Sequence, residues 1–255
     1  ASRGHQVKVF EASHQIGGQF NIAKTIPGKE EFYETLRYFK RQIELQPNIQ
    51  LVLNHTATFD ELVNSQFDDI VVATGVTPRQ LQIDGIDHPK VLSYIQVLRE
   101  RVAVGQRVAI IGAGGIGFDT AEYLSHEGES GSLNPEKFYA EWGIDTAYEH
   151  VGGLKQPELE KSEREIYLLQ RKTTPLGIGL GKTSGWVHRA QLKKHAVRML
   201  RGVQYKAVTN EGLWVEMNGQ DQLLRVDTIV VCAGQESVKD LMPQQGQATL
   251  ANYHI

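Results

Sequence analysis

The hydrophobic pattern of the chain alternates between short unbroken apolar runs and helical periodicities. Runs of this kind, typical of strands covered on both faces of a parallel sheet, lie at 70–72, 108–111 and 229–232. Residues 30–45 instead place large apolar side chains three and four positions apart, which predicts an amphipathic helix. Together these patterns favour an α/β fold.

The remaining periodicities predict further elements. Strands are expected at 49–54, 165–170, 203–208, 213–217 and 223–226. Helical segments are expected at 60–64, 91–102 and 186–200. Asn218-Gly219 lies between two of the strands and is a hairpin signal. Residues 127–163 are rich in Gly, Ser, Pro and charge, and their length predicts a surface insertion rather than an ordinary loop.

A glycine motif follows the apolar run at 108–111 without a break, and a helical pattern begins at once. Its glycines are Gly112, Gly114, Gly115 and Gly117. In G-x-G-x-x-G spacing the first glycine makes the tight turn and the second lets a pyrophosphate approach the backbone. The last lets the helix pack closely on the strand, and the helix offers free N–H groups to phosphates. We therefore predict a dinucleotide site; the alternative is a tight strand–helix turn without a ligand.

An internal duplication indicates a second unit of the same type. Phe67–Gly75 and Val226–Gly234 share an Asp, then Ile-Val-Val, then a small residue and a glycine at equal offsets. The chain thus contains two nucleotide-binding units, in tandem or one inserted in the other.

The two units differ in the charge of the residues that end a corresponding strand in each. Glu11 ends an extended segment in the first unit, and Gln170-Arg171-Lys172 ends the corresponding segment of the second. A carboxylate accepts hydrogen bonds from ribose hydroxyls but repels a 2′-phosphate, which Arg and Lys favour. We expect FAD in the first unit and NADPH, rather than NADH, in the second. The alternative for Arg171 and Lys172 is a solvated basic pair.

Composition narrows the function classes. A formal charge of −3 over 255 residues gives no support for a nucleic-acid or membrane partner, and neither a transmembrane run nor a signal peptide is visible. Cys232, the single cysteine, excludes an intrachain disulfide, a C-x-x-C redox pair and a cysteine-ligated iron–sulfur cluster within these residues. Because it lies in an apolar run, we expect a buried thiol. A cytoplasmic location fits these facts.

The start of the chain corresponds to the second strand of a βαβ unit. The preceding strand and its glycine loop would lie upstream of Gly4, and the first residue is not Met. We therefore expect a piece of a longer protein.

Several segments carry a resemblance to a known family. They are GHQVKVFEASHQIGGQFNIAKTIPGKEEFYETLRYF, KVLSYIQVLR, VAIIGAGGIGFDTAEYLS, LLQRKTTPLGIGLGKTSGWVHR and VVCAGQE. The chain as far as Glu236 resembles bacterial NADPH-dependent 2,4-dienoyl-CoA reductases, which act in fatty acid β-oxidation, and the tail matches less well. In that family NADPH gives hydride to FAD, and electrons pass through an iron–sulfur (4Fe-4S) cluster to FMN in a barrel domain. That barrel domain, which reduces the dienoyl thioester, would be a partner absent from this sequence.

The resemblance assigns site residues. It implies an FAD site at Glu11, Gly17, Gly18, Gln19, Lys29 and Ala57. It implies that Arg171 and Lys172 hold the 2′-phosphate of NADPH, helped by Arg189. The alternatives are a solvated side chain for Lys29 and a helix-surface charge for Arg189. Since hydride transfer depends on positioning two rings, no catalytic side chain is expected.

The resulting prediction is an α/β protein of two Rossmann-like FAD/NAD(P)-binding domains with parallel sheets. The NADPH domain, 89–234, is inserted in a truncated FAD domain, 1–88 and 235–255. Because glycine motifs of the FAD site are missing at both ends, we expect FAD binding to be weak or lost and the isolated fragment to be inactive. The alternative is a nucleotide-binding module without redox activity, either one that holds ADP as in amine dehydrogenase relatives or an inactive fragment.

Overall fold

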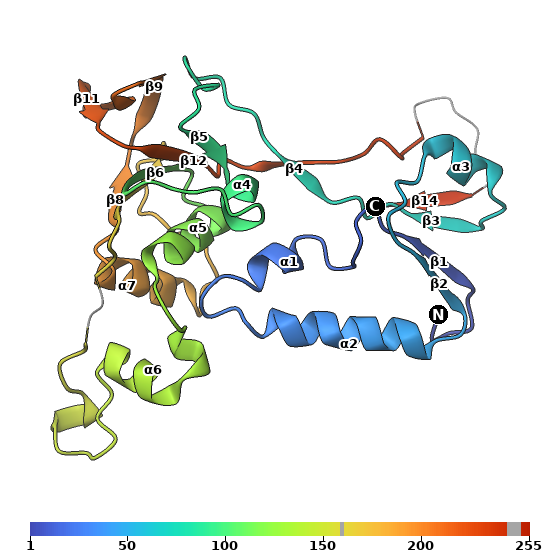
Figure 1. The fold of residues 1–255 in the computed structure, drawn as a ribbon, viewed down its shortest axis with the longest axis horizontal. Helices are drawn as coiled ribbons and strands as arrows, with labels where there is room; N and C mark the ends of the chain where they lie inside the picture. The colour runs from blue at the N-terminus through green and yellow to red at the C-terminus, as the bar shows by residue number, and fades with distance from the viewer. Residues whose placement is uncertain (159–160, 244–250) are drawn as a thin grey trace. The chain divides into compact units, whose positions relative to one another are not determined.

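The chain divides into two compact units in the computed structural model (Figure 1). The residues described are 1–158, 161–243 and 251–255. Unit 1 consists of residues 1–21, 32–77 and 235–255, and unit 2 of residues 22–31 and 78–234. Unit 2 is therefore inserted in unit 1 along the chain.

Unit 1 contains two pairs of parallel strands. Strand β1 (Val7–Phe10) pairs with β2 (Ile49–Val52), and β3 (Asp69–Val71) pairs with β14 (Asn252–His254). The predicted amphipathic helix is present as α2 (Phe32–Leu45). The short helix α3 (Phe59–Asn64) begins at Thr58, whose side chain accepts a hydrogen bond from the backbone N–H of Glu61, the usual way a threonine caps a helix. Leu62, Ile70 and Val72 form a small core.

The centre of unit 2 is a five-stranded parallel sheet. Its spatial order is β5 (Val91–Ser93), β12 (Thr228–Val231), β6 (Arg107–Ile111), β7 (Glu165–Gln170) and β8 (Arg198–Arg201). The duplicated segments therefore contain β3 and β12, both paired in parallel, and this confirms the α/β fold with parallel sheets.

Different layers cover the two faces of this sheet. Helices α4 (Tyr94–Leu98), α5 (Gly115–Ser125) and α7 (Gly185–Lys194) pack on one face, together with Val108 and Ile110 of β6. The alternate residues Ala109 and Ile111 belong to the core on the other face, shared with an antiparallel sheet. That sheet consists of β9 (Gln204–Thr209), β10 (Gly212–Met217) and β11 (Gln220–Leu224).

Two short segments group with unit 2, although the predicted domain limits assigned them to the FAD domain. Helix α1 (Phe20–Ala23) crosses the boundary, and Ile22 and Ile26 belong to the helix-side core of unit 2. Residues 78–88 contain Leu81 and Ile83, which pack against the core beneath the antiparallel sheet. Strands β4 (Val76–Pro78) and β13 (Gln235–Ser237) pair with each other where the chain passes between the units.

Two other predicted elements differ from the structure. The helix expected at 186–200 ends at Lys194, because Ala196 takes a positive φ of 60° and Val197 leads into β8. The insertion at 127–163 contains a helix that was not predicted, α6 (Pro135–Trp142), flanked by the 3-10 turns η1 (Gly131–Leu133) and η2 (Val151–Gly153). By contrast, Asn218 and Gly219 both have positive φ between β10 and β11, which confirms the hairpin.

Candidate functional site

The glycine loop joins the central strand β6 to helix α5 in unit 2. Gly112 has a φ of 107°, and a Cβ added there would lie 2.6 Å from the carbonyl oxygen of Cys232. A Cβ added to Gly117 would lie 1.8 Å from the carbonyl oxygen of Gly112. The turn and the close helix–strand contact therefore both require glycine, as the spacing predicted.

The middle of the same loop is open. No atom lies within 4 Å of a Cβ built on Gly114 or Gly115. Gly114 is the N-cap of α5 and offers no side chain to the first N–H groups of the helix. These groups are free to donate to an anion, and the helix dipole favours negative charge at the same point.

Sheet topology places this loop where ligands bind in open α/β sheets. The chain continues from β6 to β7 and β8 on one side, and it later returns to β12 on the other side of β6. This reversal of strand order defines a topological switch point beside β6. The backbone N–H of Gly112 donates to the carbonyl of Leu169 (3.0 Å). The glycine loop is thereby bound directly to the end of β7.

The basic residues predicted to read the 2′-phosphate follow this contact. Arg171 and Lys172 are exposed and come directly after β7. The Gln170 side-chain amide donates to the backbone carbonyls of Lys172 (3.1 Å) and Thr174 (2.8 Å), and so it holds the turn that carries both cations. The structure therefore brings the glycine loop and the basic strand end to one edge of the sheet.

Arg189 has a different environment. Its guanidinium donates to the carbonyl oxygen of Gly177 (3.0 Å), in the loop between β7 and α7. Gly177 has a φ of 74°, and a Cβ there would lie 2.8 Å from the ring of Phe118 on α5. Arg189 thus stabilises a loop that packs on the glycine-loop helix; a contact with the 2′-phosphate stays a prediction.

Two acidic residues of α5 form ion pairs with side chains from other segments. The Lys29 ammonium lies 2.5 Å from the Asp119 carboxylate, so Lys29, expected at the FAD site, has its partner in unit 2. His188 Nδ1 lies 2.8 Å from Glu122 Oε1. The hydrogen bond with Glu122 raises the pKa of His188, and burial opposes that rise only in part. Sequence reasoning missed this pair because its members are 66 residues apart.

The predicted FAD residues other than Lys29 lie in unit 1. Glu11 follows β1, and its carboxylate accepts hydrogen bonds from the backbone N–H (2.8 Å) and hydroxyl (2.6 Å) of Ser13. Gly17 has a φ of 119°, and an added Cβ would lie 2.6 Å from Leu36. Gly18 also has positive φ and faces open space. Gln19 is exposed, and Ala57 packs against the unit 1 core.

Cys232 is buried behind the glycine loop, as its apolar surroundings predicted. Its thiol is 3.5 Å from the Thr120 hydroxyl, and burial raises its pKa to about 12. Within the described ranges, no helix is long and apolar enough to span a membrane. In the same ranges, no group of three or more His, Cys, Asp or Glu residues is arranged to hold a metal ion.

The chain was compared with known proteins. A family model described as pyridine nucleotide-disulphide oxidoreductase matches residues 1–254. The metal reductase of Desulforamulus reducens is 30% identical over an alignment 255 residues long, which covers 94% of this chain and 36% of the relative. The cinnamate reductase of Clostridium sporogenes is 27% identical over 241 residues, which cover 94% of this chain and 31% of the relative. The chain spans about a third of the length of these relatives.

Solved structures have a similar fold. The chain matches 2-naphthoyl-CoA reductase, solved with 2-naphthoyl-CoA, with a TM-score of 0.78 and 25% identity, over 100% of this chain and 33% of that one. Histamine dehydrogenase from Rhizobium sp. 4-9 matches with a TM-score of 0.70 and 14% identity, over 99% and 37%. At 14% identity, the likeness to histamine dehydrogenase shows a similar fold and nothing more.

Proposed function

The chain belongs to the pyridine nucleotide-disulphide oxidoreductase family, and from this premise we propose that it is the NADPH- and FAD-binding electron-input part of an oxidoreductase resembling 2,4-dienoyl-CoA reductase. Family membership implies binding of FAD and NAD(P)H, and it makes the chain a module of a flavin-dependent oxidoreductase. The choice of NADPH, the substrate class and the further domain belong to the proposal.

One observation carries the choice of NADPH. The glycine loop is hydrogen-bonded to the end of β7 through Gly112 and Leu169, and Arg171 and Lys172 follow two and three residues later. A dinucleotide whose pyrophosphate lies at the N-terminus of α5 extends its adenosine ribose toward the end of the second strand. A pair of cations there favours a 2′-phosphate, and Arg can bind it through two parallel N–H donors.

The residues of unit 1 fit a flavin nucleotide. Glu11 lies at a strand end where a carboxylate accepts hydrogen bonds from ribose hydroxyls, and Gly18 presents bare backbone to open space. Gly17, Gly18, Gln19 and Ala57 would line this site. The FAD contact expected for Lys29 stays a prediction, since Lys29 belongs to unit 2 and pairs there with Asp119. Bound FAD would accept hydride from NADPH and pass electrons to the further domain.

The substrate class is inferred from the relatives. The metal and cinnamate enzymes are reductases by name, and the structural neighbour at 25% identity was solved with an aromatic acyl-CoA thioester. These likenesses support a reductase that acts on an unsaturated acyl-CoA. They also support a chain of which this module is about a third, with a barrel domain carrying FMN and a 4Fe-4S cluster as its partner.

The test is a pair of titrations with NADPH and NADH on the full chain supplied with FAD. The wild-type chain should bind NADPH more tightly than NADH. Arg171→Ala should weaken NADPH binding by about 1.5–3 kcal/mol, the usual range for hydrogen bonds to charged groups, and leave NADH nearly unaffected. Arg99→Ala, which removes an exposed arginine paired with Glu100, is the matched control. Equal losses for both dinucleotides in Arg171→Ala would contradict the proposal.

An absorption spectrum separates this function from a module without redox activity. Flavin absorbance that bleaches when NADPH is added supports electron input. A protein that binds NADPH but holds no flavin supports a bare nucleotide-binding module instead.

A further inference from the structure

Helix α2 of unit 1 has an apolar face that is not buried. Its members are spaced four, three and four residues apart and so lie on one side of the helix; they are Phe32, Leu36, Phe39 and Ile43. No residue of α2 is buried, and Phe39 is 54% exposed. A helix in a folded protein gains most of its stability by packing such a face, so this one indicates a missing partner.

The opposite side of α2 is charged and exposed. Arg37 pairs with Glu34 (2.6 Å), and Arg41 pairs with Glu44 (3.2 Å). Ion pairs three residues apart are typical of the solvent side of a surface helix. The helix therefore has one side suited to water and one side suited to packing, and only the first is in its proper environment.

Phe20 extends this apolar face beyond the helix, because its ring meets that of Phe32 edge-on with centroids 4.9 Å apart. Phe20 is 43% exposed. If a fully exposed aromatic residue presents about 200 Å², Phe20 and Phe39 present about 200 Å² together, and the three half-buried members of the face add at most about as much. A stable dimer buries about 800 Å² on each partner. The face is thus too small to hold a second copy, and it suits a helix of the same protein, which loses less entropy on packing.

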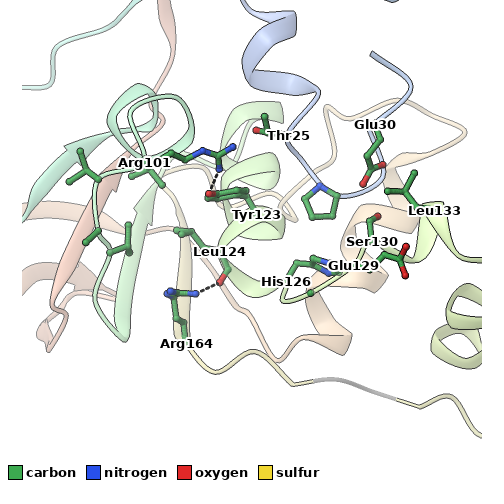
Figure 2. Close-up of a pocket in the computed structure, with 16 residues that line it drawn as sticks. Thr25, Glu30, Arg101, Tyr123, Leu124, His126, Glu129, Ser130, Leu133 and Arg164 are labelled. Carbon is green, nitrogen blue, oxygen red and sulfur yellow. Dashed lines mark hydrogen bonds between the residues drawn. The ribbon is translucent and has the colours of Figure 1, made fainter. Parts of the chain in front are cut away.

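The segment between α1 and α2 is engaged in unit 2 and does not supply this partner. The backbone N–H of Gly28 donates to the hydroxyl of Ser130 (3.2 Å), and Glu30 accepts from the hydroxyl of Ser132 (2.6 Å). Glu30 and Ser130 lie in the wall of a cavity of about 540 Å³ in unit 2 (Figure 2). The partner of α2 must therefore come from elsewhere.

The first residues of the chain form a turn beside the end of α2. The backbone N–H of Gly4 donates to the carbonyl of Ala1 (2.8 Å), and Gly4 has a φ of 91°. A glycine of positive φ commonly follows the last turn of a helix. The side chain of Asn48, just past α2, donates to the carbonyls of Ala1 (2.9 Å) and His5 (2.7 Å). The turn is thereby fixed at the C-terminal end of α2 (Figure 1).

The strands that follow indicate where a helix ending at this turn would lie. The turn leads into β1, and α2 leads into β2. Strands β1 and β2 are parallel neighbours whose register begins with Val7 opposite Ile49. Right-handed crossovers place the helices that lead into adjacent parallel strands on the same face of the sheet. A helix ending at residues 1–4 would therefore lie along α2 and run in the same direction.

We propose that the apolar face of α2 is a docking surface for a helix of the same protein that leads into Ala1. This helix carries apolar side chains three and four residues apart, and they pack on the face that Phe39 leaves exposed. The chain spans about a third of the length of its relatives, which leaves ample sequence for such a helix. The helix would also stabilise the two-stranded sheet of β1 and β2, since so small a sheet needs a helix or further strands. The inference does not depend on which nucleotide either unit binds.

The proposal is tested by hydrogen exchange of the α2 amides, measured by mass spectrometry. Three proteins are compared: residues 1–255, the complete protein, and an extended chain. The extended chain carries about 30 residues that precede Ala1, roughly the length of a strand, a helix and their connection. The α2 amides should exchange about 10-fold to 100-fold more slowly in the extended chain and the complete protein than in residues 1–255, because packing suppresses local opening.

Two substitutions within α2 identify the face that is covered. Phe39→Ser in the extended chain should return the exchange of α2 to the rate seen in residues 1–255. Tyr38→Ser is the matched control, because Tyr38 is also 54% exposed and lies outside the apolar face. It should leave the slow exchange of the extended chain unchanged. In residues 1–255 the two variants should exchange alike.

Four results would overturn the proposal. Equal exchange of α2 in all three proteins would show that the face stays uncovered. Slow exchange in the complete protein alone would assign the face to another domain. Exchange in residues 1–255 that slows with rising protein concentration would assign it to a second copy. Equal effects of Phe39→Ser and Tyr38→Ser in the extended chain would show that the apolar face is not the contact.

Discussion

His188 on α7 and Glu122 on α5 form a half-buried ion pair whose nearest atoms are 2.8 Å apart. The Glu122 carboxylate is almost fully buried, with 7% of its side chain exposed. The pair connects the helix that starts at the glycine loop to the helix that follows the basic strand end. A charged His188 compensates the buried carboxylate, so the contact depends on pH.

The contribution of this ion pair to the stability of unit 2 should decrease as pH rises above 6.5. The hydrogen bond to Glu122 raises the pKa of His188 above its ordinary value of 6.5. Because the pKa of His188 is raised in the folded protein, the stabilisation by the ion pair is complete below pH 6.5. It is lost as pH rises through the pKa of His188 in the folded protein. Urea unfolding of wild type and His188→Gln across this range measures it. The difference between the two proteins should shrink with rising pH; a constant difference would contradict the linkage.

Gly117→Ala should destabilise the protein by about 1–3 kcal/mol, the usual cost of overpacking. The added methyl group would lie 1.8 Å from the carbonyl oxygen of Gly112, so α5 must move away from β6. NADPH affinity should fall as well, because the helix N-terminus moves with it. Urea unfolding and NADPH titration provide the two measurements.

Gly115→Ala is the matched control for this substitution. Its Cβ meets no atom within 4 Å, and alanine is the better helix former. The folded protein should therefore be as stable as wild type or more so. Equal destabilisation by the two substitutions would show that the Gly112–Gly117 contact does not limit helix placement.

Arg189→Ala should weaken NADPH and NADH binding alike. Because the guanidinium holds the Gly177 carbonyl, its loss frees a loop beside the site without removing a phosphate ligand. The expected loss is about 0.5–1.5 kcal/mol, the range for a typical hydrogen bond. A loss confined to NADPH would instead assign Arg189 to the 2′-phosphate. The same titrations that test Arg171 make the measurement.

Cys232 should resist alkylation in the folded protein. Burial raises the pKa of its thiol to about 12, and only the thiolate reacts rapidly. Mass spectrometry after treatment with N-ethylmaleimide should find the folded chain unmodified and the urea-unfolded chain modified once. Rapid modification of the folded chain would show that the segment behind the glycine loop opens readily.

The sequence was sufficient to predict the structure where one local rule determined the conformation. The apolar run at 108–111 and the glycines after it predicted the turn, the strand and the start of α5, because each depends on neighbouring residues. Asn134-Pro135 and Gly143 also carried the signals of a helix start and end. Helix α6 was still missed, because the Gly, Ser, Pro and charged residues of the whole segment 127–163 outweighed these local signals.

Contacts between distant segments could not be predicted in this way. His188 and Glu122 are 66 residues apart, and they meet only where α7 packs against α5. The helix expected at 186–200 ended early because residues 198–201 pair with β7, a tertiary interaction that overrides helical propensity. The local pattern of these segments gave no sign of their partners.

The pairing of β4 with β13 has a consequence for how such a chain can arise. The backbone N–H of Arg79 donates to the carbonyl of Gly234 (3.1 Å), and that of Val238 donates to Gly75 (3.0 Å). The two points where the long insertion leaves and re-enters unit 1 are therefore neighbouring strands, as at the base of a hairpin. Loop-closure entropy grows only slowly with length, and a folded insert with adjacent ends adds little to it. An ancestral hairpin loop could be replaced by an entire domain at small thermodynamic cost to its host.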